Sequence, residues 1–176
     1  SVPPPEIGRD VKYADQLVAE LELLNKSGQP WFLNATFVNP HDIALFGLYA
    51  NLATTTWDFP VDETLPQTLF TQEFQKTHLE SLATKPPAQT YYRDLYRDFL
   101  QPIPPHLLDK YYRVYYTLQK QVDQEMRRVW EKLKSLRCYQ ETICLFVSDH
   151  GELLAAHSNM HQKWYTSYEE SIHVPF

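Results

Sequence analysis

A continuous apolar run in the last quarter of the sequence ends abruptly at three chemically distinct residues. The run spans residues 142–148 (TICLFVS), and Asp149, His150 and Gly151 follow it directly. Such a run of β-branched and aromatic residues is typical of a strand buried on both faces of a parallel sheet. In open α/β sheets, ligands bind just outside the carboxyl ends of the strands. The run therefore predicts a site at Asp149 and His150, with an ordinary strand-to-loop turn as the alternative.

Asp149 and His150 are neighbours in the chain, and neighbouring side chains on a straight strand point to opposite faces of the sheet. Both can reach one ligand only if the chain turns here. Gly151 allows such a turn, because glycine adopts backbone angles that other residues avoid. A carboxylate beside an imidazole is a combination that metal sites use, so the pair is a candidate half of a metal site.

Helical and strand-like patterns alternate along the chain. Apolar residues recur at helical spacing in two segments, and other segments have the composition of buried strands. The expected order is a helix over 11–24 that ends at Gly28, a strand over 30–38, a helix over 115–136, the strand over 142–148, a short helix over 164–171 and a strand from 172. This order predicts an α/β fold with a mostly parallel sheet flanked by helices on both faces.

Residues 39–105 have no sustained period and contain eight of the thirteen prolines. A stretch of this length without a regular pattern inside a compact domain is usually a functional loop or lid. We therefore expect residues 39–105 to form a long, ordered insertion in a single domain.

Two patches of the sequence resemble the sulfatase family of the alkaline phosphatase superfamily. The first is residues 148–176 (SDHGELLAAHSNMHQKWYTSYEESIHVPF), and the second is residues 30–42 (PWFLNATFVNPHD). Between them, residues 111–136 resemble the family's tyrosine-rich helix with an internal acid, here Asp123. The patches occur in the family's order, and the resemblance covers about half of the chain. It implies the alkaline-phosphatase/sulfatase-like α/β fold.

The resemblance also implies a role for five residues. Asp149 and His150 would be the second pair of metal ligands, and Lys163 would bind the sulfate. His41 would contact the sulfate and its leaving oxygen, and His161 would line the pocket. One divalent ion is expected. Ca²⁺ is the first candidate, and the imidazole of His150, where many members have Asn, leaves Mn²⁺ and Zn²⁺ as alternatives.

One departure from the family pattern concerns the nucleophile. Sulfatases use a formylglycine made from the first residue of a Cys/Ser-x-Pro-x-Arg motif, and neither Cys138 nor Cys144 stands in such a motif. The resemblance thus implies an incomplete catalytic domain, a central fragment without the nucleophile part and the C-terminal subdomain. We expect the formylglycine only in that missing N-terminal part, and the isolated chain to be inactive.

The leading hypothesis is therefore a fragment of a metal-dependent sulfuric ester hydrolase, arylsulfatase-like, whose substrate is a sulfate ester. A phosphate or phosphonate monoester hydrolase of the same superfamily is one alternative. A non-catalytic module that binds an anion or a partner is the other. The sequence of the nucleophile region would distinguish these hypotheses, because a Cys-x-Pro-x-Arg motif there would support the sulfuric ester hydrolase.

Composition excludes some partners. The net charge of −6 gives no electrostatic footprint for nucleic acid. No apolar run approaches the roughly 20 residues that a membrane span needs. The sequence leaves the compartment open. A sheet that lacks strands would expose its edges, so self-association through exposed sheet edges is also expected.

Overall fold

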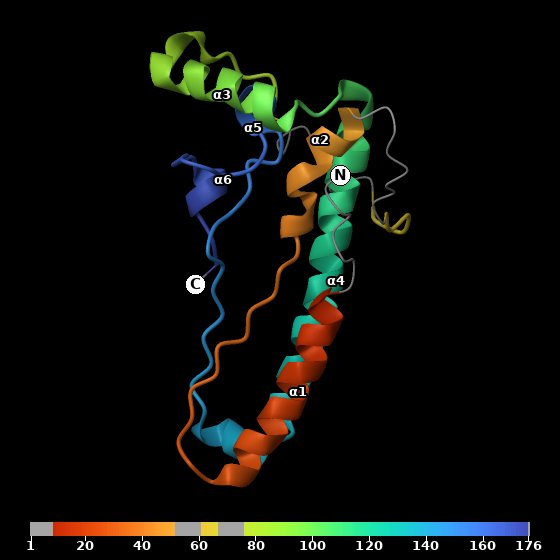
Figure 1. Ribbon diagram of the computed structural model, residues 1–176, viewed down its shortest axis with the longest axis vertical. Helices are drawn as coiled ribbons and strands as arrows, with labels where there is room; N and C mark the ends of the chain where they lie inside the picture. Colours follow the sequence, from red (N-terminus) through yellow and green to blue (C-terminus); the bar gives the residue numbers. More distant parts are fainter. Residues whose placement is uncertain (1–8, 52–60, 67–75, 176) are drawn as a thin grey trace. The chain divides into compact units, whose positions relative to one another are not determined.

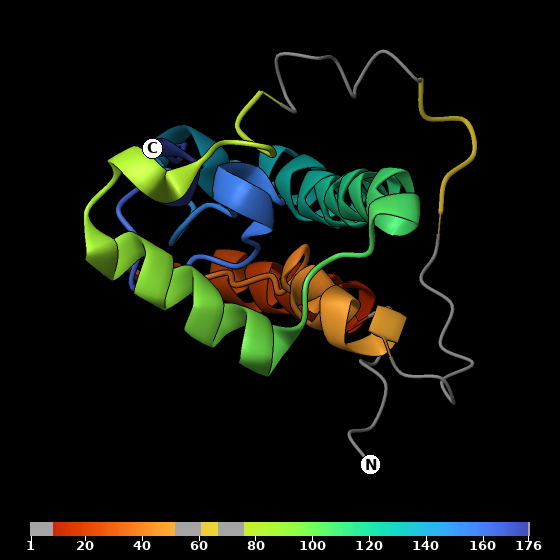
Figure 2. The same ribbon diagram turned by 90° about the horizontal axis from the view of Figure 1, so that it is seen from above.

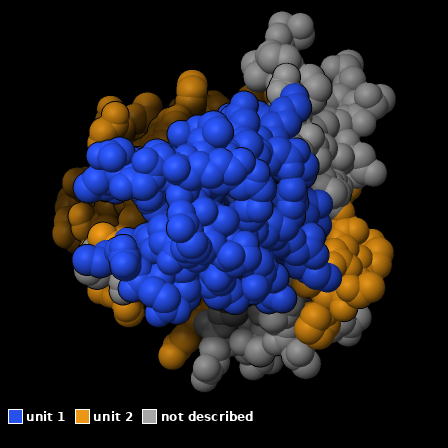
Figure 3. Space-filling view, turned by 90° about the horizontal axis from the view of Figure 1, so that it is seen from below, with its two compact units in different colours: residues 1–42, 116–144 blue, residues 43–115, 145–176 orange. Residues whose placement is uncertain are grey.

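The computed structural model describes residues 9–51, 61–66 and 76–175. The chain divides into two compact units, which Figure 3 colours separately. The first unit contains residues 1–42 and 116–144, and the second contains residues 43–115 and 145–176. Parts of the expected insertion, residues 52–60 and 67–75, lie outside the described residues.

The first unit is built on two of the expected helices. Helix α1 (Arg9–Ser27) lies beside the C-terminal part of the long helix α4 (Leu108–Lys134), as Figure 1 shows. Their apolar stripes face each other and bury Ala14 and Leu21 of α1 with Leu118, Val122 and Leu133 of α4. Ion pairs between Asp15 and Arg128 and between Glu22 and Lys132 flank this contact. Both helices therefore confirm the 3.6-residue periodicity of the sequence.

Asp10, near the start of α1, and Gly28, directly after its end, each have a structural role. The buried carboxylate of Asp10 accepts hydrogen bonds from the backbone N–H of Val38, over 2.8 Å, and of Asn39, over 3.1 Å. Asp10 therefore ties the following segment to α1. The helix ends before Gly28, whose φ of +65° is a conformation that glycine adopts without steric cost.

The expected parallel sheet is wrong: the described residues contain no β-strand. The segments 30–38 and 142–148, expected as buried strands, run as open chain (Figure 1). Their side chains are largely in solvent; Phe32 is 91% exposed, and Ile143 and Leu145 are 90% and 79% exposed. A strand needs a neighbouring backbone to satisfy its N–H and C=O groups, and no strand partner is present in the part of the chain described here. The expected self-association through sheet edges is therefore unsupported, because the described residues form no sheet.

The second unit is also helical. Its helices are α2 (Phe46–Asn51), α3 (Pro87–Leu100), the N-terminal part of α4, and the short segments α5 (Ala156–Asn159) and α6 (Glu169–Ile172). Figure 2 follows the chain from α3 into α4. The core of this unit consists of large, mostly aromatic side chains: Phe46, Tyr49, Tyr96, Leu100, Ile103, Tyr111, Tyr112, Leu153 and Met160.

Residues 39–105 were expected as an insertion without regular pattern. Their described parts contain the α-helices α2 and α3 and the 3-10 helices His41–Leu45 and Leu82–Thr84. Helix α3 was not predicted from the sequence. Pro86 and Pro87 stand at its start, where a missing N–H costs nothing. Among the described residues, no helix is long and apolar enough to cross a membrane.

Candidate functional site

The candidate metal pair lies on a turn at the end of the apolar run. The Asp149 side chain is 86% exposed and that of His150 is 39% exposed, and His150 Nε2 lies 3.5 Å from Asp149 Oδ2. His150 Nδ1 lies 3.0 Å from the carbonyl oxygen of Gly151. An Nδ1–H that donates to this carbonyl would leave Nε2, which faces the Asp149 carboxylate, as the nitrogen that could bind an ion, which is the usual arrangement for a metal-ligating histidine.

Gly151 holds this turn against the chain near α6. Its N–H donates to the carbonyl oxygen of Ser171 over 2.8 Å. A Cβ atom added at Gly151 would lie 2.0 Å from the carbonyl oxygen of Glu170. The expected reason for this glycine was an unusual backbone angle, but its φ is not in the left-handed region. The close approach of two backbones is therefore what requires glycine here.

Residues 152–163 form a loop after this turn. The carboxylate of Glu152 joins the two ends of this loop, which we call its neck. Glu152 Oε1 accepts hydrogen bonds from the N–H of Gln162 and, over 3.3 Å, from the N–H of Leu154. The Tyr111 hydroxyl donates to the same oxygen over 3.4 Å. A backbone hydrogen bond from Leu153 to Gln162, 3.0 Å long, lies beside these contacts. Burial raises the pKa of Glu152, and the hydrogen bonds that it accepts oppose this rise.

Lys163 follows the neck of this loop directly. Its ammonium donates to Gln162 Oε1 over 3.2 Å. Burial lowers the pKa of Lys163, because desolvation disfavours the charged form, and the negative charges of Glu152 and Asp149 oppose this effect. The carboxylate of the candidate metal pair and the candidate sulfate-binding lysine therefore lie within electrostatic range of each other.

His161 is enclosed in the aromatic core of the second unit. It is 3% exposed, and its ring meets those of Tyr96 and Tyr111 edge-on at centroid distances of 6.2 Å and 6.4 Å. Neither ring nitrogen has a hydrogen-bond partner among the described residues. Burial lowers the pKa of His161 to about 4, so the ring is neutral at pH 7. A neutral imidazole with two unused nitrogens can donate one hydrogen bond and accept another.

His41 belongs to the first unit, whereas the other four candidate residues belong to the second. It is exposed at the start of the 3-10 helix His41–Leu45, and its N–H donates to the carbonyl oxygen of Val38 over 3.0 Å. The neighbouring Asp42 is buried and pairs with Arg9 over 2.6 Å, so its role is structural. Its expected contact with the sulfate stays a prediction.

Asp149 and His150 suit half of a divalent-ion site in chemistry and in the orientation of the imidazole. Within the described residues, no group of three or more His, Cys, Asp or Glu side chains is placed to hold a metal ion. The role of the pair as metal ligands therefore stays a prediction.

Sequence reasoning did not assign the polar residues that support the loop. Neither the contacts of Glu152 nor the pairing of His157 with Glu80 and Glu170 was predicted. The partners of His157 include one that is 77 residues away in the chain, and no local pattern indicates such a contact.

Comparison with known proteins gives one match. A protein-family model with the description "Sulfatase" matches residues 4–176, which is nearly the whole chain. No curated protein and no solved structure matches the chain.

Proposed function

Because the chain belongs to the sulfatase family, we propose that it carries part of the active site of a metal-dependent hydrolase of sulfuric esters. In this proposal Asp149 and His150 bind one divalent ion, with Ca²⁺ as the first candidate and Mn²⁺ and Zn²⁺ as alternatives. Lys163 and His161 bind the sulfate group of the ester. The observation that supports the proposal is the electrostatic interaction of Lys163 with Asp149, the residues that the proposal assigns to the anion and to the ion.

An ion held by Asp149 and His150 would polarise the sulfuryl oxygens as a Lewis acid. Lys163 supplies a compact positive charge for the anion. Burial makes that charge costly in the absence of an anion, and a bound sulfate ester would offset part of this cost. His161 is neutral and enclosed, so its role would be to donate a hydrogen bond from a ring N–H to an ester oxygen.

His41 would contact the sulfate and its leaving oxygen, where it could supply the proton that the leaving alkoxide needs. Residues 39–105 would shape the choice of substrate. Neither Cys138 nor Cys144 stands in a Cys-x-Pro-x-Arg motif. We therefore expect the isolated chain to bind a sulfate ester and a divalent ion without turning the ester over. Loss of a nucleophile alone costs on the order of 10⁶-fold in a hydrolase.

A binding experiment on the whole chain tests this proposal. Titration with Mn²⁺, followed by the paramagnetic broadening of backbone amide signals, should broaden residues around Asp149 and His150. D149A should abolish this broadening. The matched control D123A removes an exposed carboxylate from α4 and should leave it unchanged.

The anion half is tested with 4-nitrophenyl sulfate in the presence of Ca²⁺, with binding measured by calorimetry. K163A should weaken binding at least tenfold, whereas K26A, at the end of α1, should not. Tight binding of two zinc ions with a preference for a phosphate ester would favour the phosphate monoester hydrolase. Binding of the ester without any metal would favour the non-catalytic anion-binding module.

A further inference from the structure

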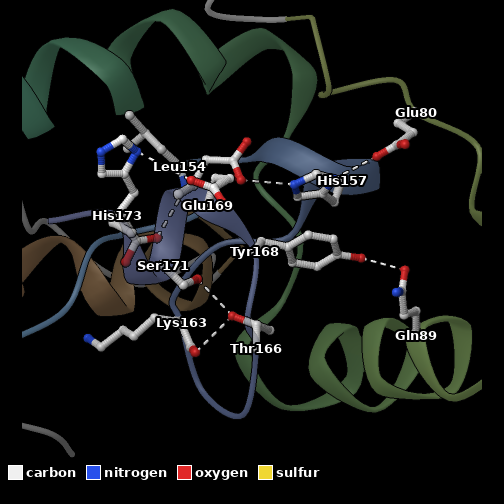
Figure 4. A network of polar contacts seen from close by, with 12 residues as sticks. Glu80, Gln89, Leu154, His157, Lys163, Thr166, Tyr168, Glu169, Ser171 and His173 are labelled. Carbon is white, nitrogen blue, oxygen red and sulfur yellow. Dashed lines mark hydrogen bonds and ion pairs between the residues drawn. The ribbon is translucent and has the colours of Figure 1, made fainter.

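His157 lies between two carboxylates in the loop that ends at Lys163. It occupies the left-handed turn α5, with φ 50° and ψ 60°, and is 8% exposed. Its Nδ1 lies 2.6 Å from Glu80 Oε2, and its Nε2 lies 3.1 Å from Glu170 Oε2. Figure 4 shows the ring with Glu80 on one side and the α6 region on the other. Both nitrogens of one imidazole therefore face acceptor atoms.

Glu80 is held from a second side as well. Its carboxylate also pairs with Lys85, whose Nζ lies 2.9 Å from Oε1. Hydrogen bonds from His157 and from Lys85 lower the pKa of Glu80. The ring of His157 and the ammonium of Lys85 thus both contact the Glu80 carboxylate.

The face of the ring is held as well. The Tyr168 ring stacks on the imidazole with a centroid distance of 3.7 Å and an interplanar angle of 12°. Stacked aromatic rings interact favourably beyond their buried area. The Tyr168 hydroxyl donates to Gln89 Oε1 on α3 over 2.6 Å (Figure 4). Two segments of the second unit, at Glu80 and at residues 168–170, therefore fix His157 at both nitrogens and on one face.

These contacts connect the turn at Asp149 and His150 with the loop that carries Lys163. Glu170 is the residue whose backbone oxygen approaches Gly151, directly after the Asp149–His150 pair. His157 stands in the loop that carries His161 and Lys163. Resting on the function proposed above, we propose that His157 is a positioning residue. Its ring, held between Glu80 and Glu170, sets the place of Lys163 relative to Asp149 and His150.

Variants of the two carboxylates test these contacts directly. E80Q and E170Q keep the size of each side chain and remove one charge beside the His157 ring. H173Q is the matched control, because His173 contacts Glu169 over 3.3 Å with both side chains more than 80% exposed.

Binding of 4-nitrophenyl sulfate tests the positioning role. H157Q should weaken binding about tenfold, as expected for a residue that orients a ligand, and H173Q should leave it within twofold. E80Q and E170Q should fall between the two, which keeps the test decisive if H157Q does not fold. Binding by H157Q equal to that of the wild type would overturn the inference.

The inference and the proposed function can fail separately. If the wild-type chain binds no sulfate ester, the proposed function fails, and amide hydrogen exchange then decides the role of His157. Exchange at Gln162 and Lys163 should be faster in H157Q and unchanged in H173Q. Exchange that is the same in H157Q as in the wild type would show that His157 does not hold this loop.

Discussion

The hydroxyl of Tyr111 donates a hydrogen bond to Oε1 of Glu152 over 3.4 Å, and this oxygen is also the acceptor for the two backbone N–H groups at the neck of the loop. Tyr111 is fully buried on α4, and burial raises its pKa well above the ordinary value. One carboxylate thus joins α4 to both sides of the loop neck that precedes Lys163.

The change Glu152→Ala should destabilise the chain strongly. It removes the acceptor for three donors, and an enclosed donor without a partner costs about 1–3 kcal/mol. We expect the free energy of unfolding, measured by urea denaturation, to fall by roughly 3 kcal/mol. Glu169→Ala removes an exposed carboxylate 17 residues later and should change it by less than about 0.5 kcal/mol. Equal losses in the two variants would show that the neck contacts contribute nothing.

The pH dependence of stability should contain a component from His161. Its pKa is about 4 in the folded chain and 6.5 as the reference for the unfolded chain, because burial disfavours the charged ring. Between these values the unfolded chain binds a proton that the folded chain does not, so stability falls as the pH drops from 6.5 to 4. The loss should approach roughly 3 kcal/mol.

His161→Phe keeps the edge-on aromatic packing and removes the titration. The difference in unfolding free energy between this variant and the wild type, measured from pH 7 to pH 4, should therefore shift in favour of the variant as the pH falls. A difference that stays constant over this range would mean that His161 is not enclosed in the folded chain.

Glu80 should add a second component to the pH dependence of stability, at lower pH than the component from His161. Its folded pKa lies below the model-compound value of 4.5, because it accepts hydrogen bonds from His157 and Lys85. The stability that this carboxylate contributes is present above about pH 4.5 and is lost as the pH falls through the lower, folded pKa. Glu80→Gln should remove this component, so that the thermal unfolding midpoint changes less between pH 5 and pH 3 than in the wild type. Parallel curves for the two proteins would contradict the prediction.

Gly151→Ala should disturb the turn that carries Asp149 and His150. The new Cβ would lie 2.0 Å from a backbone oxygen, which cannot move aside as a flexible side chain can. We expect a loss of at least about 3 kcal/mol in unfolding free energy, at the upper end of the range for overpacking. Gly28→Ala is the comparison: no atom lies within 4 Å of its Cβ, and only its φ of +65° opposes the change. That variant should lose about 1 kcal/mol.

Helices with one long apolar stripe could be predicted from the sequence. Helices α1 and α4 each follow a 3.6-residue period over several turns, and the structure confirms both. Helix α3 was missed although its apolar residues recur as adjacent pairs four residues apart, which is a helical spacing, because residues 39–105 were treated as one stretch without a period. On this helix Tyr96 and Leu100 are buried, while Tyr91 and Phe99 are exposed.

The prediction of the two strands was wrong for a different reason. An apolar run predicts burial, but a strand exists only where a second backbone pairs with it, and no local pattern supplies that partner. The same limit applies to the site. The turn at Asp149 and His150 follows from neighbouring residues, whereas the contact of His157 with Glu80 joins residues far apart in the sequence. Such contacts depend on the packing of the whole unit.

The exposure of residues 143–147 has a consequence for proteolysis. An extended segment with bulky apolar side chains in solvent is a preferred substrate for proteases such as chymotrypsin, and Leu145 and Phe146 are 79% and 62% exposed. Cleavage after Phe146 would release a peptide that contains Asp149, His150, His161 and Lys163 from its covalent link to the preceding chain. Only non-covalent contacts, such as those of Glu152 with Tyr111 and of His157 with Glu80, would then retain it. If the nicked protein stays associated during gel filtration, the peptide that contains these residues is a part of the molecule that can be exchanged separately.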